Sequence, residues 1–486
     1  MYEIMKKFEF TGETKTINLL FGTATLHRIR AVAKFGFVEI GELGGWIEKE
    51  ENLSHEENAW VYGDAKVYGN AKVYGNAEVR DKAEVCGNAI VYGNAKVGED
   101  AEVYDNAEVC GNVIVFGNAK VRGKAEVCGN AIVCDNAKVG ENAEVYGKAL
   151  IYGDAKVYGN AKVYGNAKVG EDAEVYDKAE VYDKAEVYGN AQIYGNAIVR
   201  ANAKVYGKAE VCGKAGVGGK AEIRDDAKVY DKAIVCEDAN VYGKAQIYGD
   251  AKVWYDAKVY GNAEVCGKAE VRGKAEIRDD ANVYGNANVY GNAKIYGNAK
   301  VYDNAKVWDD AKVYDNAEVC GNAKVWYDAK VYGNAKVYSN AEVYSNAKVY
   351  DNAKVWEDAI VCSNVKVYGN AIVCGNAKVY GNAKVYGNAE VCGKAEVCGK
   401  AEVFSTRHVL VIGTIGSQDD FATFYRDKDN EITVKCGYFL DKIDKFLEKV
   451  TETHGDSNYA LVCRAAVEAA RLQIDLSNEV TKDADE

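Results

Sequence analysis

Proline is absent from all 486 residues of the sequence. A proline has no backbone N–H, so it removes a hydrogen bond wherever it enters a ladder of strands, and sheets confine it to edges and bulges. The lack of proline therefore favours long, uninterrupted backbone ladders.

Histidine is nearly as scarce. The four histidines are His27, His55, His408 and His454, so residues 59–403 contain none. Histidine is the side chain that most often acts as a general acid or base near neutral pH. Histidine-based catalysis is therefore expected only in the two end segments.

Long hydrophobic segments are missing as well. No run reaches the 18 or more consecutive apolar residues that indicate a transmembrane helix. Charged residues occur between Met1 and Phe10, where a secretion signal needs its apolar segment. We expect no membrane partner and a cytoplasmic location.

A six-residue repeat occupies most of the sequence. An alanine followed two residues later by valine or isoleucine recurs in 58 consecutive hexads from Ala59 to Val403, and only Val113 and Val365 replace the alanine. Residues two apart point to the same side of a strand, so these side chains face inward and their neighbours face outward. Gly-Asn, Asp-Asn or Gly-Lys pairs close the hexads and tolerate positive φ. Each hexad is therefore expected to form a four-residue strand and a corner, and successive coils should stack.

The hexads resemble those of the hexapeptide-repeat superfamily, and the segment Val-Tyr-Gly-Asn-Ala-Lys at residues 157–162 fits that motif. The resemblance implies an all-β fold, a single-stranded, left-handed, triangular parallel β-helix with about 18 residues, or three hexads, per coil. Residues 59–403 would then form about 19 coils and a rod roughly 90 Å long. The open ends of such a rod are strand edges that need caps. We expect an N-terminal β-rich cap at 1–58 and a small C-terminal α+β domain at 404–486.

The N-terminal segment carries a second resemblance. Residues 26–30 (Leu-His-Arg-Ile-Arg), 44–48 (Gly-Gly-Trp-Ile-Glu) and 51–54 (Glu-Asn-Leu-Ser) resemble the N-terminal region of uncharacterised bacterial and prophage-borne hexapeptide proteins of the YdcK-like group. That resemblance implies a prophage association and brings no established activity.

The C-terminal segment has a different pattern. Residues 409–412 read as a buried strand, 421–426 and 431–436 as a hairpin, and 440–453 and 458–474 as helices. Residues 413–417 (Gly-Thr-Ile-Gly-Ser) are compatible with a tight turn or with an anion-binding turn, although the lysine of a phosphate-binding loop is missing. If the chain has a specific partner, this domain is the first candidate to bind it.

The charge balance bears on nucleic-acid partners. The whole chain has a formal charge of −13, but residues 59–403 carry 44 basic and 48 acidic side chains. A DNA mimic about 90 Å long would present on the order of fifty negative charges. The near balance therefore argues against mimicry and against a basic nucleic-acid groove, so we expect no nucleic-acid partner.

Twelve of the fourteen cysteines occupy the outward position after the hexad valine. Reduced surface thiols are the simplest interpretation. Cys110 and Cys128, and also Cys374 and Cys392, lie three hexads apart and would be close enough on adjacent coils for oxidation to bridge them.

Aromatic residues dominate the same outward position, where 30 of the 58 residues are tyrosine. With three hexads in each coil, two sets should form ladders. The first is Tyr296, Tyr314, Tyr332, Tyr350, Tyr368 and Tyr386, and the second is Tyr290, Trp308, Trp326 and Tyr344. Outward aromatics can stabilise a sheet by stacking on one another. An exposed aromatic stripe can instead form a contact surface for a protein partner, a sugar polymer or a second copy of the chain.

Two classes of function remain. The favoured hypothesis is a non-enzymatic structural or interaction protein, a spacer or scaffold with aromatic faces and a C-terminal recognition domain, which needs no cofactor or metal. The alternatives are a self-assembling rod and an acyltransferase-like enzyme, which the superfamily resemblance implies and which would use His408 or His454 in an end segment. Regular coils offer little of the concavity that substrate pockets require.

Overall fold

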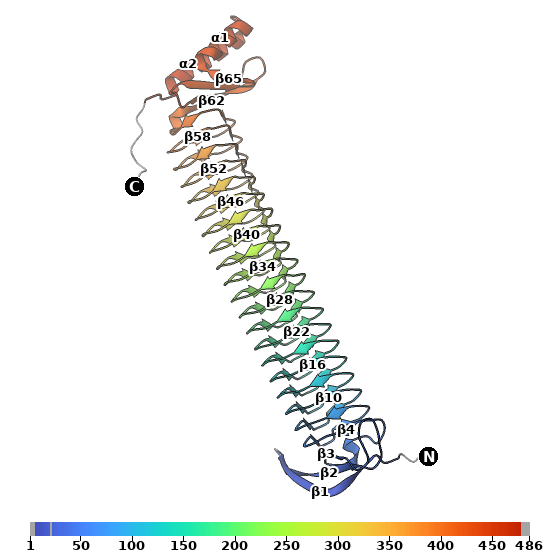
Figure 1. Ribbon diagram of the computed structural model, residues 1–486. Coiled ribbons are helices and arrows are strands. Elements are labelled where there is room, and N and C mark those ends of the chain that lie inside the picture. Colours follow the sequence, from blue (N-terminus) through green and yellow to red (C-terminus); the bar gives the residue numbers. More distant parts are fainter. Residues whose placement is uncertain (1–4, 20–21, 478–486) are drawn as a thin grey trace. The chain divides into compact units, whose positions relative to one another are not determined.

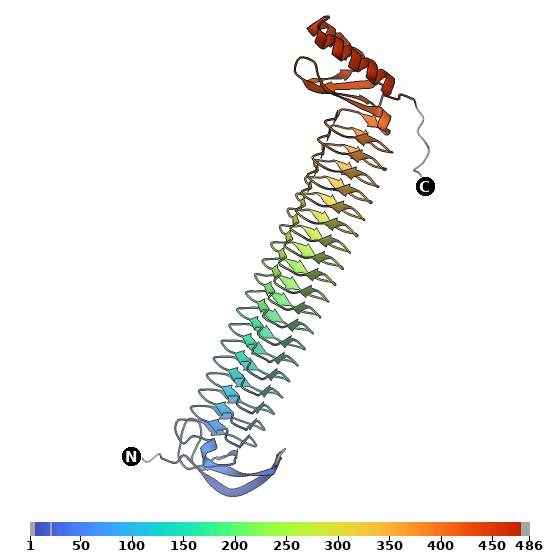
Figure 2. The same cartoon turned by 180° about the vertical axis from the view of Figure 1, so that it is seen from behind.

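The computed structural model describes residues 5–19 and 22–477, and it divides the chain into two compact units, Met1–Lys244 and Ala245–Glu486. Both units contain stacked coils of short strands, which can be followed from blue to green and from green to orange in Figures 1 and 2. The predicted parallel solenoid is confirmed within each unit.

The coils of the first unit run from β4 (Trp60–Val61) to β34 (Asn240–Val241), and the two-residue strands recur once in every hexad. Each strand pairs in parallel with the strand three places later, as β10 (Lys96–Val97) does with β13 (Ile114–Val115), so three hexads make one coil. The strands are shorter than the four residues predicted, because the corners bend the chain on both sides of each strand.

The second unit repeats this pattern from β35 (Gln246–Ile247) to β61 (Glu402–Val403). Within it, β43 (Lys294–Ile295) pairs in parallel with β46 (Lys312–Val313). The Lys294 N–H donates to the carbonyl oxygen of Ala311 at 3.0 Å. A proline at such a position would remove this bond, which accounts for the missing residue type.

The interior of the coils consists of the hexad alanines and valines. Ala203 and Val205 have no solvent-exposed surface, and the two valines that replace alanine, Val113 and Val365, are buried in the same way. Burying a valine side chain contributes roughly 1.5–3 kcal/mol. The thin core is therefore repeated in every coil, and the predicted inward positions are confirmed.

At each corner, one residue of the hexad has a positive backbone φ and so lies in the left-handed conformation. Gly111 has φ 75°, and a Cβ there would lie 2.7 Å from the carbonyl oxygen of Gly129 on the next coil. Asparagine side chains on the corners form ladders, and the Asn88 amide donates to Asn106 at 3.0 Å. The corners therefore add side-chain hydrogen bonds between coils to those of the backbone.

An antiparallel hairpin and a third strand close the first unit. β1 (Phe8–Leu19) pairs with β2 (Gly22–Ala31), and β2 pairs with β3 (Leu43–Ile47). β3 then pairs in parallel with β5 (Lys66–Val67) of the first coils, and the short 3₁₀ helix η1 (Glu50–Asn52) follows β3. The β-rich cap is thus an extension of one face of the solenoid.

The C-terminal segment forms an antiparallel sheet and two helices. The 3₁₀ helix η2 (Thr406–His408) leads into a sheet in the order β62 (Val409–Ile415), β63 (Asp420–Arg426), β64 (Ile432–Cys436) and β65 (Phe439–Lys442), followed by α1 (Ile443–His454) and α2 (Asn458–Gln473). Phe424 and Val434 pack with Phe446 of α1 and Val467 of α2 in one core. The α+β prediction is confirmed.

Two predicted boundaries in this segment were wrong. The first strand continues to Ile415, and a turn with φ 76° at Gly416 follows, so the glycine segment is a strand end and a tight turn. The first helix begins at Ile443 rather than at residue 440, because Phe439–Lys442 pairs with β64 as an additional strand.

Strand β63 joins this domain to the last coils of the second unit. The Glu396 N–H donates to Thr423 Oγ1 at 2.9 Å, and the Tyr425 hydroxyl donates to the carbonyl oxygen of Cys398 at 3.2 Å. Tyr425 is fully buried. The domain therefore covers the open strand edge that the repeat leaves at this end.

None of the helices in the described part of the chain is long and apolar enough to cross a membrane.

Candidate interaction surfaces

The first predicted ladder, Tyr296 to Tyr386, lies on one face of the second unit. Successive rings have centroids 4.8–4.9 Å apart and are nearly parallel, with interplanar angles of 1–3°. The Arg278 guanidinium lies 4.6 Å from the ring centre of Tyr296 at one end. Phe404 continues the stack at the other end, 5.2 Å from Tyr386. The spacing of three hexads brings all six tyrosines together.

The second ladder lies on another face of the same unit. Trp308 and Trp326 stack with centroids 4.8 Å apart, Tyr290 lies 5.5 Å from Trp308, and Tyr344 lies 4.7 Å from Trp326. The Arg272 guanidinium lies 4.9 Å from the ring centre of Tyr290. All ten residues named from the sequence thus fall into the two expected stacks.

Stacking changes what these rings present to solvent. All ten side chains are half-buried, because each ring face contacts the ring on the next coil. Stacked aromatic pairs contribute about 0.5–1.5 kcal/mol each. Ring edges and hydroxyl groups, rather than ring faces, are therefore available to a partner, and a role in binding stays a prediction.

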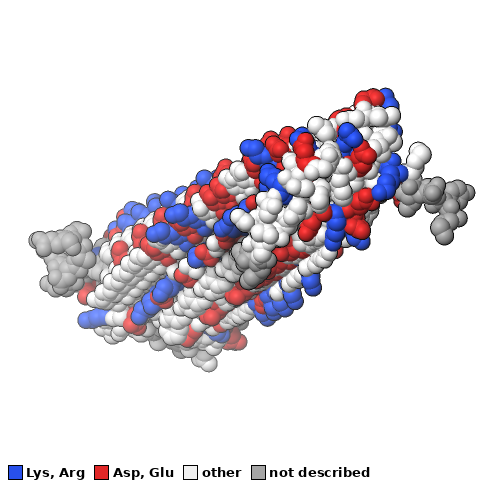
Figure 3. Space-filling model, turned by 90° about the horizontal axis from the view of Figure 1, so that it is seen from below, with Lys and Arg blue, Asp and Glu red and all other residues white. Residues whose placement is uncertain are grey.

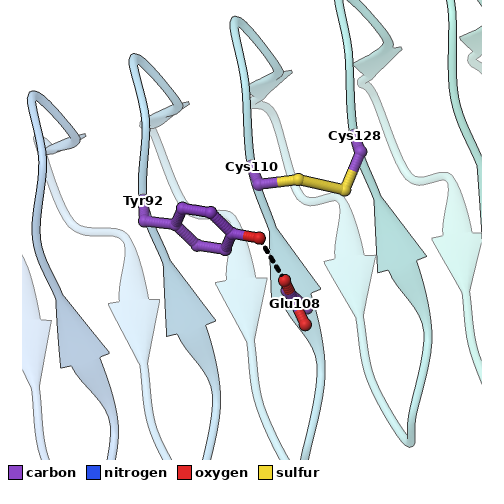
Figure 4. The surroundings of a disulfide bond; sticks show 4 residues. All are labelled: Tyr92, Glu108, Cys110 and Cys128. Carbon is purple, nitrogen blue, oxygen red and sulfur yellow. Dashed lines mark hydrogen bonds between the residues drawn. A yellow bond between two sulfur atoms is a disulfide. The ribbon is translucent and has the colours of Figure 1, made fainter.

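Many tyrosines outside these ladders donate to a glutamate on the next coil, a feature that sequence reasoning missed. The Tyr248 hydroxyl donates to Glu264 at 3.0 Å, and Tyr92 makes the same bond to Glu108, which Figure 4 shows. In both pairs the partner lies 16 residues after the tyrosine. A glutamate 16 residues after a tyrosine is visible in the sequence, and this spacing could have predicted the hydrogen bond.

Two cysteine pairs form disulfide bonds between adjacent coils. Cys110–Cys128, shown in Figure 4, and Cys374–Cys392 have Cα atoms 4.7 and 4.6 Å apart. Both are the pairs for which the sequence allowed a bridge. In the described part of the chain, ten further cysteines are free thiols.

His408 is packed inside the C-terminal domain. It is 2% exposed, its Nδ1 accepts the Phe404 N–H at 3.3 Å, and its ring meets that of Phe404 edge-on. Burial, together with the positive charge of Arg426, lowers the pKa of His408 to about 4. The imidazole is therefore neutral at pH 7, and its contacts with Phe404 are those of a packed core residue.

His55 is held in the N-terminal cap. Its ring stacks on Phe8 with centroids 4.2 Å apart, and its Nδ1 accepts the Lys7 N–H at 3.3 Å. Lys7 donates from Nζ to the carbonyl oxygen of Ala59 at 2.8 Å, and burial lowers the pKa of this lysine to about 8. His55 and Lys7 thus fix the chain where the first coil begins.

Charged side chains form rows along the coils, with blue and red atoms side by side on the face in Figure 3. Many belong to ion pairs between adjacent coils, such as Lys324 and Glu342 at 2.8 Å. Within residues 5–19 and 22–477, we find no group of three or more His, Cys, Asp or Glu side chains that could hold a metal ion.

Stacked parallel coils with an inward Ala/Val core define a β-solenoid repeat protein. Residues 191–207, a segment just shorter than one coil, match the family described as YdcK Beta solenoid repeat. The chain is therefore a β-solenoid repeat protein, and one segment of its repeat is similar to the YdcK repeat. The match lies inside the repeat, and not in the N-terminal segment that carried the resemblance. No curated protein matches the chain.

Proposed function

We propose that this chain is a non-enzymatic scaffold whose C-terminal domain binds a protein partner. In this proposal the coils form the support, the aromatic ladders stabilise the coils, and helix α2 provides the contact surface. The exposed apolar side of α2 is the observation that carries the proposal.

Helix α2 has apolar residues on both of its sides. Its inner side packs Ala460, Cys463 and Val467 into the domain core. On the outer side, Leu461 is 54% exposed and Val462 is 49% exposed. Leucine and valine at the same exposed turn of a helix add apolar surface to solvent, and a contiguous exposed apolar patch marks a site of protein contact.

Two further residues of α2 have large exposed side chains. Leu472 of α2 is 83% exposed, and Tyr459 is 51% exposed. By contrast, His408, one of the two histidines that an acyltransferase-like site could use, is buried and neutral. A protein-binding role therefore has more support from side-chain placement than a catalytic role.

The test is affinity capture with the full chain, followed by binding of each captured protein in purified form. We expect Leu461→Ala combined with Val462→Ala to weaken binding of a specific partner by roughly tenfold or more, because buried leucine and valine contacts are lost. Alanine keeps the helix propensity of the segment high.

The matched control is Phe37→Ala combined with Ile40→Ala, which removes two side chains that are 93% and 69% exposed in the N-terminal cap. This variant should bind the partner as the unchanged chain does. A partner that both double variants retain equally would contradict the proposal, and so would association only between copies of the chain, measured by sedimentation velocity.

A further inference from the structure

Six consecutive coils of the second unit place a lysine at the same outward position. These residues are Lys294, Lys312, Lys330, Lys348, Lys366 and Lys384. Neighbours in this column belong to directly paired strands, as Lys330 and Lys348 do. Paired parallel strands lie about 4.8 Å apart. The column therefore places six positive charges in one row on a chain whose net charge is −13.

Most of these ammonium groups lack an ionic partner. Lys294 pairs with Glu276 at 3.3 Å at one end of the row, and Lys384 pairs with Glu402 at 2.7 Å at the other. Among the described residues, no carboxylate forms an ion pair with the four lysines between them. Like charges on adjacent strands repel each other, so the row is electrostatically unfavourable in the chain alone.

Elsewhere among the described coils, runs of like charge are no longer than three, as in Lys120, Lys138 and Lys156, and many lysines have a glutamate on an adjacent coil. Lys252 pairs with Glu270 at 3.3 Å on the next coil. Lys336 pairs with Glu318 at 3.2 Å on the preceding coil. The run of six lysines is twice as long as any of these, and an arrangement that departs in this way from the rest of the molecule indicates a functional site.

The same six coils carry the first tyrosine ladder two residues after each lysine. Elsewhere a tyrosine donates to the glutamate 16 residues later, as Tyr302 does to Glu318 at 3.5 Å. In this ladder, that position is a lysine for the first five tyrosines, for example Lys348 after Tyr332. Within the described residues, none of the six ladder hydroxyls has a hydrogen-bond partner. The face therefore presents unpaired ammonium groups beside unpaired hydroxyl donors.

A shallow groove of about 740 Å³ runs along this column. Lysines 294 to 366 form one wall, and the corner residues that precede them form the other. Asp310 and Asp328 are the acidic residues on the corner wall, on the second and third of the five coils that line the groove. Asp315 and Asp351, on the far side of the tyrosines, already accept the backbone N–H groups of Gly333 and Gly369. The lysines therefore outnumber the carboxylates that face them.

We propose that this lysine–tyrosine face binds a linear acidic polysaccharide. Carboxylates spaced along such a chain would pair with the ammonium groups, and its hydroxyl and ring oxygens would accept hydrogen bonds from the tyrosine hydroxyls. Single-stranded nucleic acid is less suited, because its bases stack on aromatic ring faces, and these faces are covered by neighbouring rings. The inference goes beyond the proposed function, since it does not depend on helix α2 or on a protein partner.

The experiment measures binding of the full chain to polygalacturonate by titration calorimetry at an ionic strength of about 0.15 M, where charges on the other faces are largely screened. We expect Lys330→Gln, Lys348→Gln and Lys366→Gln together to weaken binding by roughly tenfold or more, because counterion release and ion pairing are lost. The matched control is Lys300→Gln, Lys306→Gln and Lys354→Gln, which removes the same charge from exposed lysines on the other two faces and should change the Kd by less than about twofold.

A second variant examines the hydroxyl donors without altering charge or stacking. Tyr332→Phe combined with Tyr350→Phe should weaken binding of polygalacturonate by roughly fivefold while leaving the unfolding transition in place. Equal losses in the two lysine variants would overturn the proposal. No binding of polygalacturonate would overturn it too, and so would tighter binding of oligothymidylate or polyglutamate than of polygalacturonate. Neutral dextran should not bind.

Discussion

The position of a residue within the hexad decides which environment its side chain meets. In β28 (Lys204–Val205), Val205 is fully buried whereas Lys204 is half-buried on the outer face. Two residues later, Gly207 has φ 72° at a corner where a Cβ would approach the Asp225 backbone N to 2.8 Å. Within one hexad, the valine position is buried, the lysine position is on the outer face, and the glycine position requires a positive φ. Substitutions at these three positions should therefore change stability by different amounts.

A charge at an inward position should unfold the surrounding coils. We expect Val205→Asp to lower the free energy of unfolding by about 3–5 kcal/mol, because an unpaired carboxylate would enter a core that offers it no polar partner. Limited proteolysis should then cut near residue 205. The control is Lys204→Ala on the outer side of the same strand, which should change stability by about 0.5 kcal/mol or less. Protease resistance equal to that of the unchanged chain would show that the inward assignment is wrong.

At the scale of the element, each coil is held to its neighbours by several kinds of contact in register. Strand partners, ring stacks, asparagine ladders and ion pairs all join residues 18 apart, and the backbone hydrogen bonds between coils join residues 17 apart, as from Lys294 to Ala311. The disulfides Cys110–Cys128 and Cys374–Cys392 also join residues 18 apart, by covalent bonds. Since every contact links only adjacent coils, stability should depend on local pairs of coils.

Reducing the two disulfides should weaken the coils that they join. Each bond closes an 18-residue separation, and restricting a loop of that size in the unfolded chain stabilises by about 3 kcal/mol. We expect dithiothreitol to lower the midpoint of denaturant unfolding, and Cys110→Ser combined with Cys374→Ser to abolish that sensitivity. The free cysteines Cys86 and Cys320 supply the control, since their replacement by serine should leave the effect of the reductant intact. An unfolding midpoint that dithiothreitol does not change would exclude the stabilising role.

The period of the sequence was sufficient to predict coils, inward residues and stacked columns. The spacing of three hexads alone brought Tyr296 and Tyr314 together, and likewise Cys374 and Cys392. It could not show that ring faces are covered, because side-chain rotamers decide this. The contact of Tyr425 with Cys398 could not be predicted either, because it joins the repeat to a segment that has no periodicity. The left-handed twist rests on the superfamily resemblance and stays a prediction.

At the scale of the whole molecule, summed charge conceals how charge is arranged. Residues 59–403 contain 44 basic and 48 acidic side chains, a balance that argues against DNA mimicry and against a basic nucleic-acid groove. Lysines and glutamates on adjacent coils often pair, as Lys324 and Glu342 do at 2.8 Å. The column from Lys294 to Lys384 departs from this balance locally, and its excess is offset by acidic residues elsewhere. Net charge therefore predicts behaviour at long range, whereas a bound polymer would meet the local column.

The 36 tyrosines should make the chain sensitive to alkaline pH. Burial raises the pKa of Tyr158 in the first unit to about 12, with further contributions from Glu174 and Tyr176. Burial and the neighbouring tyrosines raise the pKa of Tyr314 in the second unit to about 12. These phenols keep their protons in the folded chain at pH values where the unfolded chain, with an ordinary pKa of 10.0, has lost them. Their contribution to stability is therefore complete below pH 10 and is lost as the pH rises toward 12.

Spectrophotometric titration of the phenolate band in the folded and denatured chain provides the measurement. We expect most tyrosines of the folded chain to ionise well above pH 10, in one cooperative step with loss of the strand signal in circular dichroism, because each phenolate would repel its neighbours within a ladder. Tyr314→Phe combined with Tyr350→Phe should delay that step, since two of the titrating groups are removed and ring stacking is kept. If folded and denatured chains titrate together near pH 10, the rings are solvated separately, and the stacked ladders do not hold the coils together.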